Sequence, residues 1–234
     1  MSNVLWPQVH GLAWTLKRTT AFKTAIQPAV ANGYETRLQL GGPDPILKFE
    51  LAYAILQGQN ELSQIEAFFW DRGGSYDSFL LDAGAITKNP AESFVADQTL
   101  TMDINNNAPL VRTKPHTQSS EAIYELALDD QGNRTKPVIR KNDTVLNPNA
   151  SPPDYVLHTP AEVATGLLNA QGITYAGYVA HFGVSTAGSR ISADFGWLYR
   201  MRFAQDEQEF DMFHYLLWEA KQVQLMGTRA PLAT

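Results

Sequence analysis

Apolar and polar residues alternate with a period of two along much of this chain, as they do in strands buried on one face. The segment 191–203, ISADFGWLYRMRF, places seven apolar or aromatic residues on one face: Ile191, Ala193, Phe195, Trp197, Tyr199, Met201 and Phe203. Segments 34–40 and 47–56 alternate in the same way. The pattern predicts three half-buried strands, and shorter strands at 99–104, 121–128, 137–146, 155–158, 173–185 and 221–226.

The segment 60–70 changes to helical spacing. One apolar stripe is formed by Leu62, Ile65 and Phe68 or Phe69. Asn60 is suited to cap the first turn through its side-chain oxygen. The glycines at 73 and 74 end the helix, because glycine tolerates a left-handed backbone. We predict a helix at 60–70 that packs on a sheet, followed by a strand at 76–81.

A second helix is predicted at 206–220. Its acidic first turn suits the helix dipole, and Phe210, Phe213 and Leu217 supply an apolar stripe. The stretches 103–121 and 142–154 are rich in Asn, Pro, Asp and Ser, which predicts loops. Together these elements predict a mainly β fold: a sandwich or barrel of antiparallel strands with one or two flanking helices. We expect one domain over 1–234 with a loop-rich insertion at about 103–154.

Composition removes several classes of function. The net charge of −6 disfavours a nucleic-acid binder, which carries a basic surface, and it disfavours binding to anionic lipid. With no cysteine, the chain has no thiol catalysis and no Cys-ligated metal. The first residues lack a basic region followed by an apolar run, and no apolar stretch reaches membrane-spanning length. We expect a soluble protein made in the cytoplasm.

Residues that bear chemistry are present but scattered. The five histidines, His10, His116, His158, His181 and His214, have no metal-ligand spacing. Ser185 lacks the glycine spacing of a hydrolase elbow, and no glycine-rich loop suits a phosphate. The acids Asp71, Asp77 and Asp82 offer no reason to select a catalytic pair. We therefore expect no enzyme activity, no cofactor and no metal.

Charged residues on the polar faces of the predicted strands have two interpretations. Arg200 and Arg202, like Glu35 and Arg37, lie opposite the apolar positions. They form either a solvated face with cross-strand ion pairs or a subunit interface in which Arg binds carboxylates in bidentate fashion. The sequence leaves both open.

Three motifs occur in a fixed order along the chain. The first is E-x-R, at Glu35 and Arg37. The second is an aromatic corner with Phe68, Phe69, Arg72, Gly74, Phe79 and an acid at Asp82. The third, R-F-x-x-D, is formed by Arg202, Phe203 and Asp206. In this combination the chain resembles the distal tail proteins of long-tailed bacteriophages and phage-derived gene-transfer particles. It departs from that family at Ala83, where Pro is common, and at Ala204, where an acid is common.

The resemblance implies a structural virion protein: a ring that joins the tail tube to the baseplate hub or tail tip, assembled in the host cytoplasm. Its partners would be further copies of itself, as a hexamer or less often a trimer. Its neighbours would be the tail tube protein and hub or tail-tip proteins, with the tape measure protein as an additional candidate. The alternative is a carbohydrate-binding or hydrolytic β-sandwich acting on the host surface, with Trp197, Tyr199, Tyr175 and Tyr178 as sugar platforms.

Overall fold

A computed structural model describes residues 3–10, 12–27, 35–40, 45–57, 60–113, 120–166, 168, 175–183, 188–215 and 217–228. Within these residues the protein is mainly β, with several antiparallel sheets and three short α-helices. This confirms the fold class predicted from the sequence. Three positions named above lie outside the described residues: residue 34 at the start of the predicted strand 34–40, His116 and Ser185. No helix in the described part is long and apolar enough to cross a membrane.

Contacts within the chain divide it into two compact units. The first unit combines Met1–Leu81 with Arg200–Arg229, and the second unit is formed by Asp82–Tyr199. The sequence predicted one domain with an insertion at about 103–154. In the structure the inserted part begins earlier, ends later and builds sheets and a core of its own.

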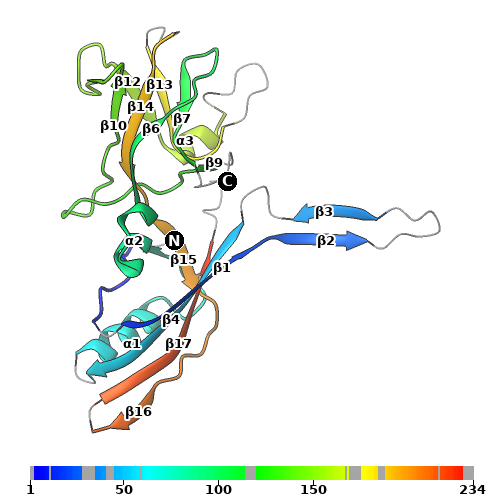
Figure 1. Cartoon of the computed structure of the whole chain (residues 1–234), viewed down its shortest axis with the longest axis vertical. Helices are drawn as coiled ribbons and strands as arrows, with labels where there is room; N and C mark the ends of the chain where they lie inside the picture. Colours follow the sequence, from blue (N-terminus) through cyan, green and yellow to red (C-terminus); the bar gives the residue numbers. More distant parts are fainter. Residues whose placement is uncertain are drawn as a thin grey trace. The chain divides into compact units, whose positions relative to one another are not determined.

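The first unit is built on a six-stranded antiparallel sheet with the order β1-β4-β17-β15-β5, and β16 pairs with β17 (Figure 1). Its strands are β1 (Leu12–Ala21), β4 (Ile46–Gln57), β5 (Phe79–Leu81), β15 (Tyr199–Phe203), β16 (Asp211–His214) and β17 (Leu217–Gly227). The predicted alternation in β4 is confirmed, because Leu47, Phe49, Leu51 and Tyr53 are all buried. Figure 1 shows β4 and β17 side by side in this sheet.

Helix α1 (Glu61–Asp71) packs against β4. Its position agrees with the helix predicted at 60–70, but two details differ. The Asn60 side chain does not cap the helix; its Oδ1 instead accepts a hydrogen bond from Gln64 Nε2 at 3.0 Å. The buried stripe is Leu62, Ile65 and Phe68, and Phe69 is only half-buried.

The helix predicted at 206–220 is wrong. Residues 211–214 and 217–227 are the strands β16 and β17. β17 lies between β4 and β15, with Leu225 opposite both Phe49 and Phe203. Backbone pairing on two sides and burial of Ala220, Val223 and Leu225 outweigh the local helical spacing.

A separate two-stranded hairpin follows β1. It consists of β2 (Lys23–Gln27) and β3 (Thr36–Leu40), paired with Ala25 opposite Leu38 and Ile26 opposite Arg37. The sequence predicted a half-buried strand at 34–40 and did not predict β2. In the structure Leu38 of β3 is exposed, and so is every residue of β2.

The second unit holds three smaller sheets. Their orders are β11-β10-β14-β6, β12-β13-β7 and β8-β9. The strands are β6 (Phe94–Thr99), β7 (Asn107–Pro109), β8 (Val111–Thr113), β9 (Ser120–Ala122), β10 (Val138–Lys141), β11 (Thr144–Val145), β12 (Tyr155–His158), β13 (Val179–Phe182) and β14 (Ile191–Gly196). The helical segments are α2 (Ala83–Thr87), a 3-10 turn (Pro90–Glu92) and α3 (Pro160–Ala164). The predicted loops at 103–121 and 142–154 therefore contain short strands where they are described.

The long strand predicted at 191–203 is two strands. β14 belongs to a sheet of the second unit and β15 to the sheet of the first. Trp197 and Leu198 separate them, and their N–H groups donate to the carbonyls of Ser93 and Glu125 rather than to a neighbouring ladder. Because the alternation of apolar residues in the sequence continues through Trp197, Tyr199 and Met201, periodicity alone does not reveal the junction.

Candidate functional site: an aromatic corner in the first unit

Five aromatic rings meet where α1, β5 and β15 come together in the first unit. They are Trp6, Phe68, Phe69, Phe79 and Phe203, and their paired ring centroids lie 4.9 to 6.2 Å apart. Phe203 lies at the centre, because it contacts the other four rings. Phe79 and Phe203 are completely buried. We call this cluster and the turn at 72–78 the aromatic corner.

The turn at 72–78 has backbone requirements that fix its residue types. Gly73 and Gly74 have φ angles of +59° and +63°, in the left-handed region. At Gly74, a Cβ atom would lie 2.9 Å from Asp206 Oδ1. That carboxylate accepts the Ser75 N–H at 2.9 Å. Only glycine at 74 lets the acid approach the turn this closely.

Asp206 links the segment after β15 to the turn at 72–78. Hydrogen bonds from the Ser75 side chain and backbone, with a smaller contribution from nearby Arg202, keep its pKa below the ordinary value. The carboxylate is therefore charged at neutral pH, when it holds a turn 131 residues away in sequence. Its pKa reflects a structural hydrogen bond rather than a group poised for proton transfer.

Arg72 is held at the centre of the same turn. Its Nη1 donates to Asp77 Oδ2 at 2.8 Å, and its guanidinium carbon lies 5.8 Å from the centroid of the Phe68 ring. The ion pair is mostly buried. The arginine of the second motif thus fixes the turn after α1 to the aromatic cluster.

The structure brings together most residues of the second and third motifs. Phe68, Phe69, Arg72, Gly74, Phe79, Phe203 and Asp206 belong to the corner. Arg202 is half-buried beside it, where it donates to the Phe203 carbonyl at 2.9 Å and contacts Met226 Sδ.

The remaining motif residues lie elsewhere. Asp82 begins the second unit and caps α2, since its Oδ1 accepts the Ala85 N–H at 3.1 Å. Glu35 and Arg37 form an exposed ion pair of 3.1 Å within their own strand segment. The first motif is therefore not part of the aromatic corner.

Two of the strand arginines, Arg200 and Arg37, differ in their exposure and in their partners. Arg200 is buried, and it donates to Asn3 Oδ1 at 2.8 Å and to Ser78 Oγ at 3.3 Å. It serves its own chain rather than a solvated face. Arg37, in contrast, is exposed and stands where another chain can reach it.

Sequence reasoning missed Trp6, which lies before the first strand. Residue 5 forms a parallel bridge with Leu80, and this places the Trp6 ring among the phenylalanines. Trp6 Nε1 donates to the Tyr53 hydroxyl at 3.3 Å. Burial raises the pKa of Tyr53 to about 12, although the hydrogen bond from Trp6 opposes the shift. An aromatic residue beside a proline was the only signal in the sequence.

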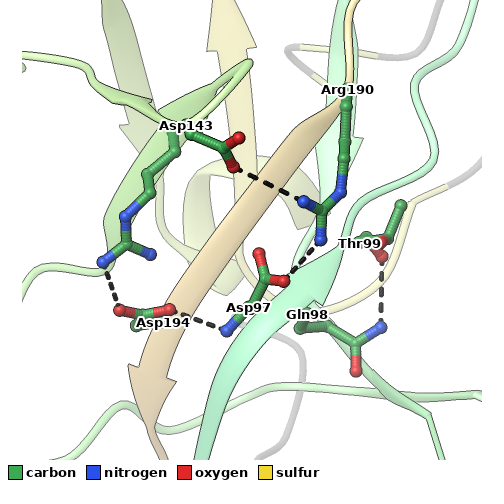
Figure 2. A network of polar contacts seen from close by, with 7 residues as sticks. Asp97, Gln98, Thr99, Asp143, Arg190 and Asp194 are labelled. Atoms are coloured by element: carbon green, nitrogen blue, oxygen red, sulfur yellow. Dashed lines mark hydrogen bonds and ion pairs between the residues drawn. The ribbon is translucent and has the colours of Figure 1, made fainter.

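A polar network in the second unit was also missed (Figure 2). Arg190 binds Asp97 and Asp143, and Arg140 donates to Asp194 Oδ2 at 2.6 Å. Asp194 also accepts the Asp97 N–H at 2.7 Å, where the register between β14 and β6 shifts. The arginine and backbone hydrogen bonds lower the pKa of Asp194. This network joins β6, β10, β14 and the turn between β10 and β11 across an irregular sheet.

Metal and sugar sites find little support in the described residues. No group of three or more His, Asp or Glu side chains there is arranged to hold a metal ion. Among the proposed sugar platforms, Trp197 and Tyr178 are buried in the core of the second unit. The Tyr199 hydroxyl accepts a hydrogen bond from Arg112 at 2.6 Å, and the Tyr175 hydroxyl accepts one from Asn107.

Comparison of the chain with models of known protein families finds no match, and a search of curated proteins finds none either. The resemblance to distal tail proteins therefore rests on the three sequence motifs alone.

Proposed function

We propose that this protein is a structural subunit of a distal tail ring in a long-tailed phage or gene-transfer particle. In this role it joins the tail tube to the baseplate hub or tail tip and performs no catalysis. The observation that supports the proposal most is the aromatic corner, in which two motif blocks meet although Ser75 and Asp206 are 131 residues apart in sequence.

The corner gives the motif residues a common physical purpose. Gly74 and Asp206 belong to different motif blocks. The Asp206 carboxylate can approach the turn this closely only because residue 74 has no side chain. The phenylalanines of both blocks pack on each other, with Phe69 and Phe203 4.9 Å apart. Motifs that fix one structural element, rather than a cleft with convergent polar groups, are what a scaffold subunit needs.

The partners follow from the proposed role. The subunit would contact copies of itself, with a hexamer favoured and a trimer as the alternative. It would also contact the tail tube protein, hub or tail-tip proteins and, as an additional candidate, the tape measure protein. The acidic balance of the chain suits the wall of a channel that must not retain DNA, and it suits neither a nucleic-acid nor a membrane partner.

The carbohydrate-binding alternative requires exposed aromatic platforms. Of its four aromatic residues, two are buried in a core, and the other two hydroxyls are hydrogen-bonded to Arg112 and Asn107 within the unit. No observation on the described residues favours that function over the ring.

Electron microscopy of particles tests the proposal. Particles released by cells that carry the gene would be labelled with gold-conjugated antibody against this chain. We expect label at the distal end of the tail, on one ring per particle. Label along the tube, on the head, or only on unassembled protein would reject the proposed role.

A further inference from the structure

Two large aromatic side chains of the first unit are exposed on the turn after α1. Trp70 is 82% exposed and Tyr76 is 93% exposed. One turn carries both rings, since the Gly73 N–H donates to the Trp70 carbonyl and the Tyr76 N–H donates to the Gly73 carbonyl. The packing of α1 needs neither ring, because its buried stripe consists of other residues. Trp is on average a largely buried residue, and Trp and Tyr are enriched where proteins contact one another.

Polar contacts fix this turn to the rest of the unit. The Ser75 N–H donates to Asp206 Oδ1 at 2.9 Å, and Arg72 Nη1 donates to Asp77 Oδ2 at 2.8 Å. The two rings are therefore carried by an ordered backbone. A partner that binds them has little backbone to order, which lowers the entropy cost of binding.

Carboxylates lie next to the two rings. Glu66 precedes Trp70 by one helical turn, so the two side chains are neighbours on the surface of α1, and Asp71 follows Trp70 directly. The hydrogen bond between the turn and the segment after β15 brings Glu207 to the turn that carries Tyr76. All three carboxylates are exposed. We call the two rings and these three carboxylates the corner surface.

Basic side chains do not neutralise the corner surface. The segments 61–81 and 203–210 contain seven Asp or Glu residues and one basic residue, Arg72. Arg72 is already paired with Asp77, and Arg202, before the second segment, donates to a backbone carbonyl. Within the described part of the chain, no ion pair involves a carboxylate of the corner surface. The surface therefore carries an excess of negative charge around two aromatic rings.

We infer that the corner surface binds an arginine-bearing segment of a neighbouring protein. This inference rests on the proposed ring function and names the chemistry of one contact that the subunit makes in the tail. Arginine fits both features of the surface, because its guanidinium group stacks on aromatic faces and also binds carboxylates in bidentate fashion. Lysine offers a compact, strongly hydrated charge and fits the rings less well.

The arginines of this chain are already engaged, so the partner is another protein rather than a second copy. Among the described residues, six arginines are paired with carboxylates of their own chain: Arg37, Arg72, Arg112, Arg134, Arg140 and Arg190. Arg200 is buried, and Arg18 lies over the Phe49 ring. Arg202 is half-buried and bonded to the backbone.

Binding of two synthetic peptides to the purified protein tests the inference. Hexa-arginine and hexa-lysine carry the same charge, so a difference between their affinities reports guanidinium contacts rather than net charge. By calorimetry we expect hexa-arginine to bind about fivefold more tightly than hexa-lysine. The double variant Trp70→Ala with Tyr76→Ala should lose most of that preference, whereas Tyr215→Ala should keep it. Tyr215 is a matched control, because it is 80% exposed in the same unit and the nearby Asp211 is already paired with Lys221.

Quenching of Trp70 fluorescence tests the charge of the corner surface separately. The emission of Trp70 is the difference between the unmodified chain and Trp70→Phe. Relative to free N-acetyltryptophanamide, caesium should quench this emission more strongly and iodide more weakly, since negative charge attracts cations and repels anions. Glu66→Gln combined with Glu207→Gln should reduce both effects. Asp130→Asn, which changes an exposed carboxylate of the second unit, should leave them unchanged.

Two results would overturn the inference. One is equal affinity for the two peptides, or a preference for hexa-arginine that the double variant retains in full. The other is quenching of Trp70 by iodide as strong as that of free N-acetyltryptophanamide. Either result would leave the ring function intact, because labelling of particles tests that function independently.

Discussion

Replacing Phe203 with Ala removes the ring that contacts all four other rings of the aromatic corner. Phe203 is completely buried, and its centroid lies 4.9 Å from Phe69 and 5.3 Å from Phe79. Truncation of a buried Phe costs about 3–5 kcal/mol through lost burial and the remaining cavity. We expect Phe203→Ala to lower the free energy of unfolding of the first unit by about that amount.

Three consecutive residues of α1 provide matched comparisons. Phe68 is buried, Phe69 is half-buried and Trp70 is exposed. Phe68→Ala should cost about 3–4 kcal/mol and Phe69→Ala about 1–3 kcal/mol. Trp70→Ala should stay within about 0.5 kcal/mol in the isolated subunit, because it removes an exposed side chain.

Urea unfolding followed by far-ultraviolet circular dichroism, at concentrations that keep the subunit monomeric, measures these differences. The slope of the unfolding free energy with urea should be unchanged, so that the midpoints report stability. A cost below about 1 kcal/mol for Phe203→Ala would refute a sealed aromatic core. An effect of Trp70→Ala as large as that of Phe68→Ala would refute the proposed exposure of Trp70.

Three further outcomes follow from the same unit. Gly74→Ala should destabilise this unit more than Gly73→Ala does. Both sites have positive φ, but only at 74 would the new Cβ lie 2.9 Å from Asp206 Oδ1. Equal midpoint shifts in urea would count against this contact. Hydrogen bonds from Ser75 lower the pKa of Asp206, so the stability that this carboxylate contributes is complete above the unfolded pKa of 3.8 and is lost as pH falls through the folded pKa. Asp206→Asn should therefore reduce the loss of stability at acid pH. An unchanged loss would contradict the bond between Asp206 and Ser75. Burial raises the pKa of Tyr53 to about 12, so the contribution of this phenol to stability is complete below pH 10.0 and is lost as pH rises from 10.0 toward 12. In an absorbance titration, Tyr53→Phe should remove one phenol that ionises near pH 12. An unchanged titration in this range would contradict the burial of Tyr53.

The elements that the sequence predicted well are those whose signal is local. In β4, buried side chains alternate from Leu47 to Tyr53, and in α1 the stripe and the two glycines lie within one short segment. β17 was missed for a physical reason. Irregularities between Trp218 and Ala220 and between Ala220 and Val223 break the period of two, and the remaining spacing resembles a helix.

In the candidate site, too, the sequence predicted local features but not contacts between distant segments. The motif residues identified from the sequence form the aromatic corner, but their contacts depend on pairing across 131 residues, which periodicity does not encode. The sequence did not predict a separate second unit, because the alternation of apolar residues runs from β14 into β15 through Trp197 and Leu198. The exposure of β3 could not be predicted either, since the alternation at 34–40 is typical of a half-buried strand.

The ring itself is the central claim, and its mass and shape test it most directly. Light scattering on the purified protein, combined with class averages from electron microscopy, gives both. We expect closed rings with six times the subunit mass of 26.0 kDa, or three times that mass for the trimer. A monomer at all concentrations, or open chains of variable length, would contradict the proposed role.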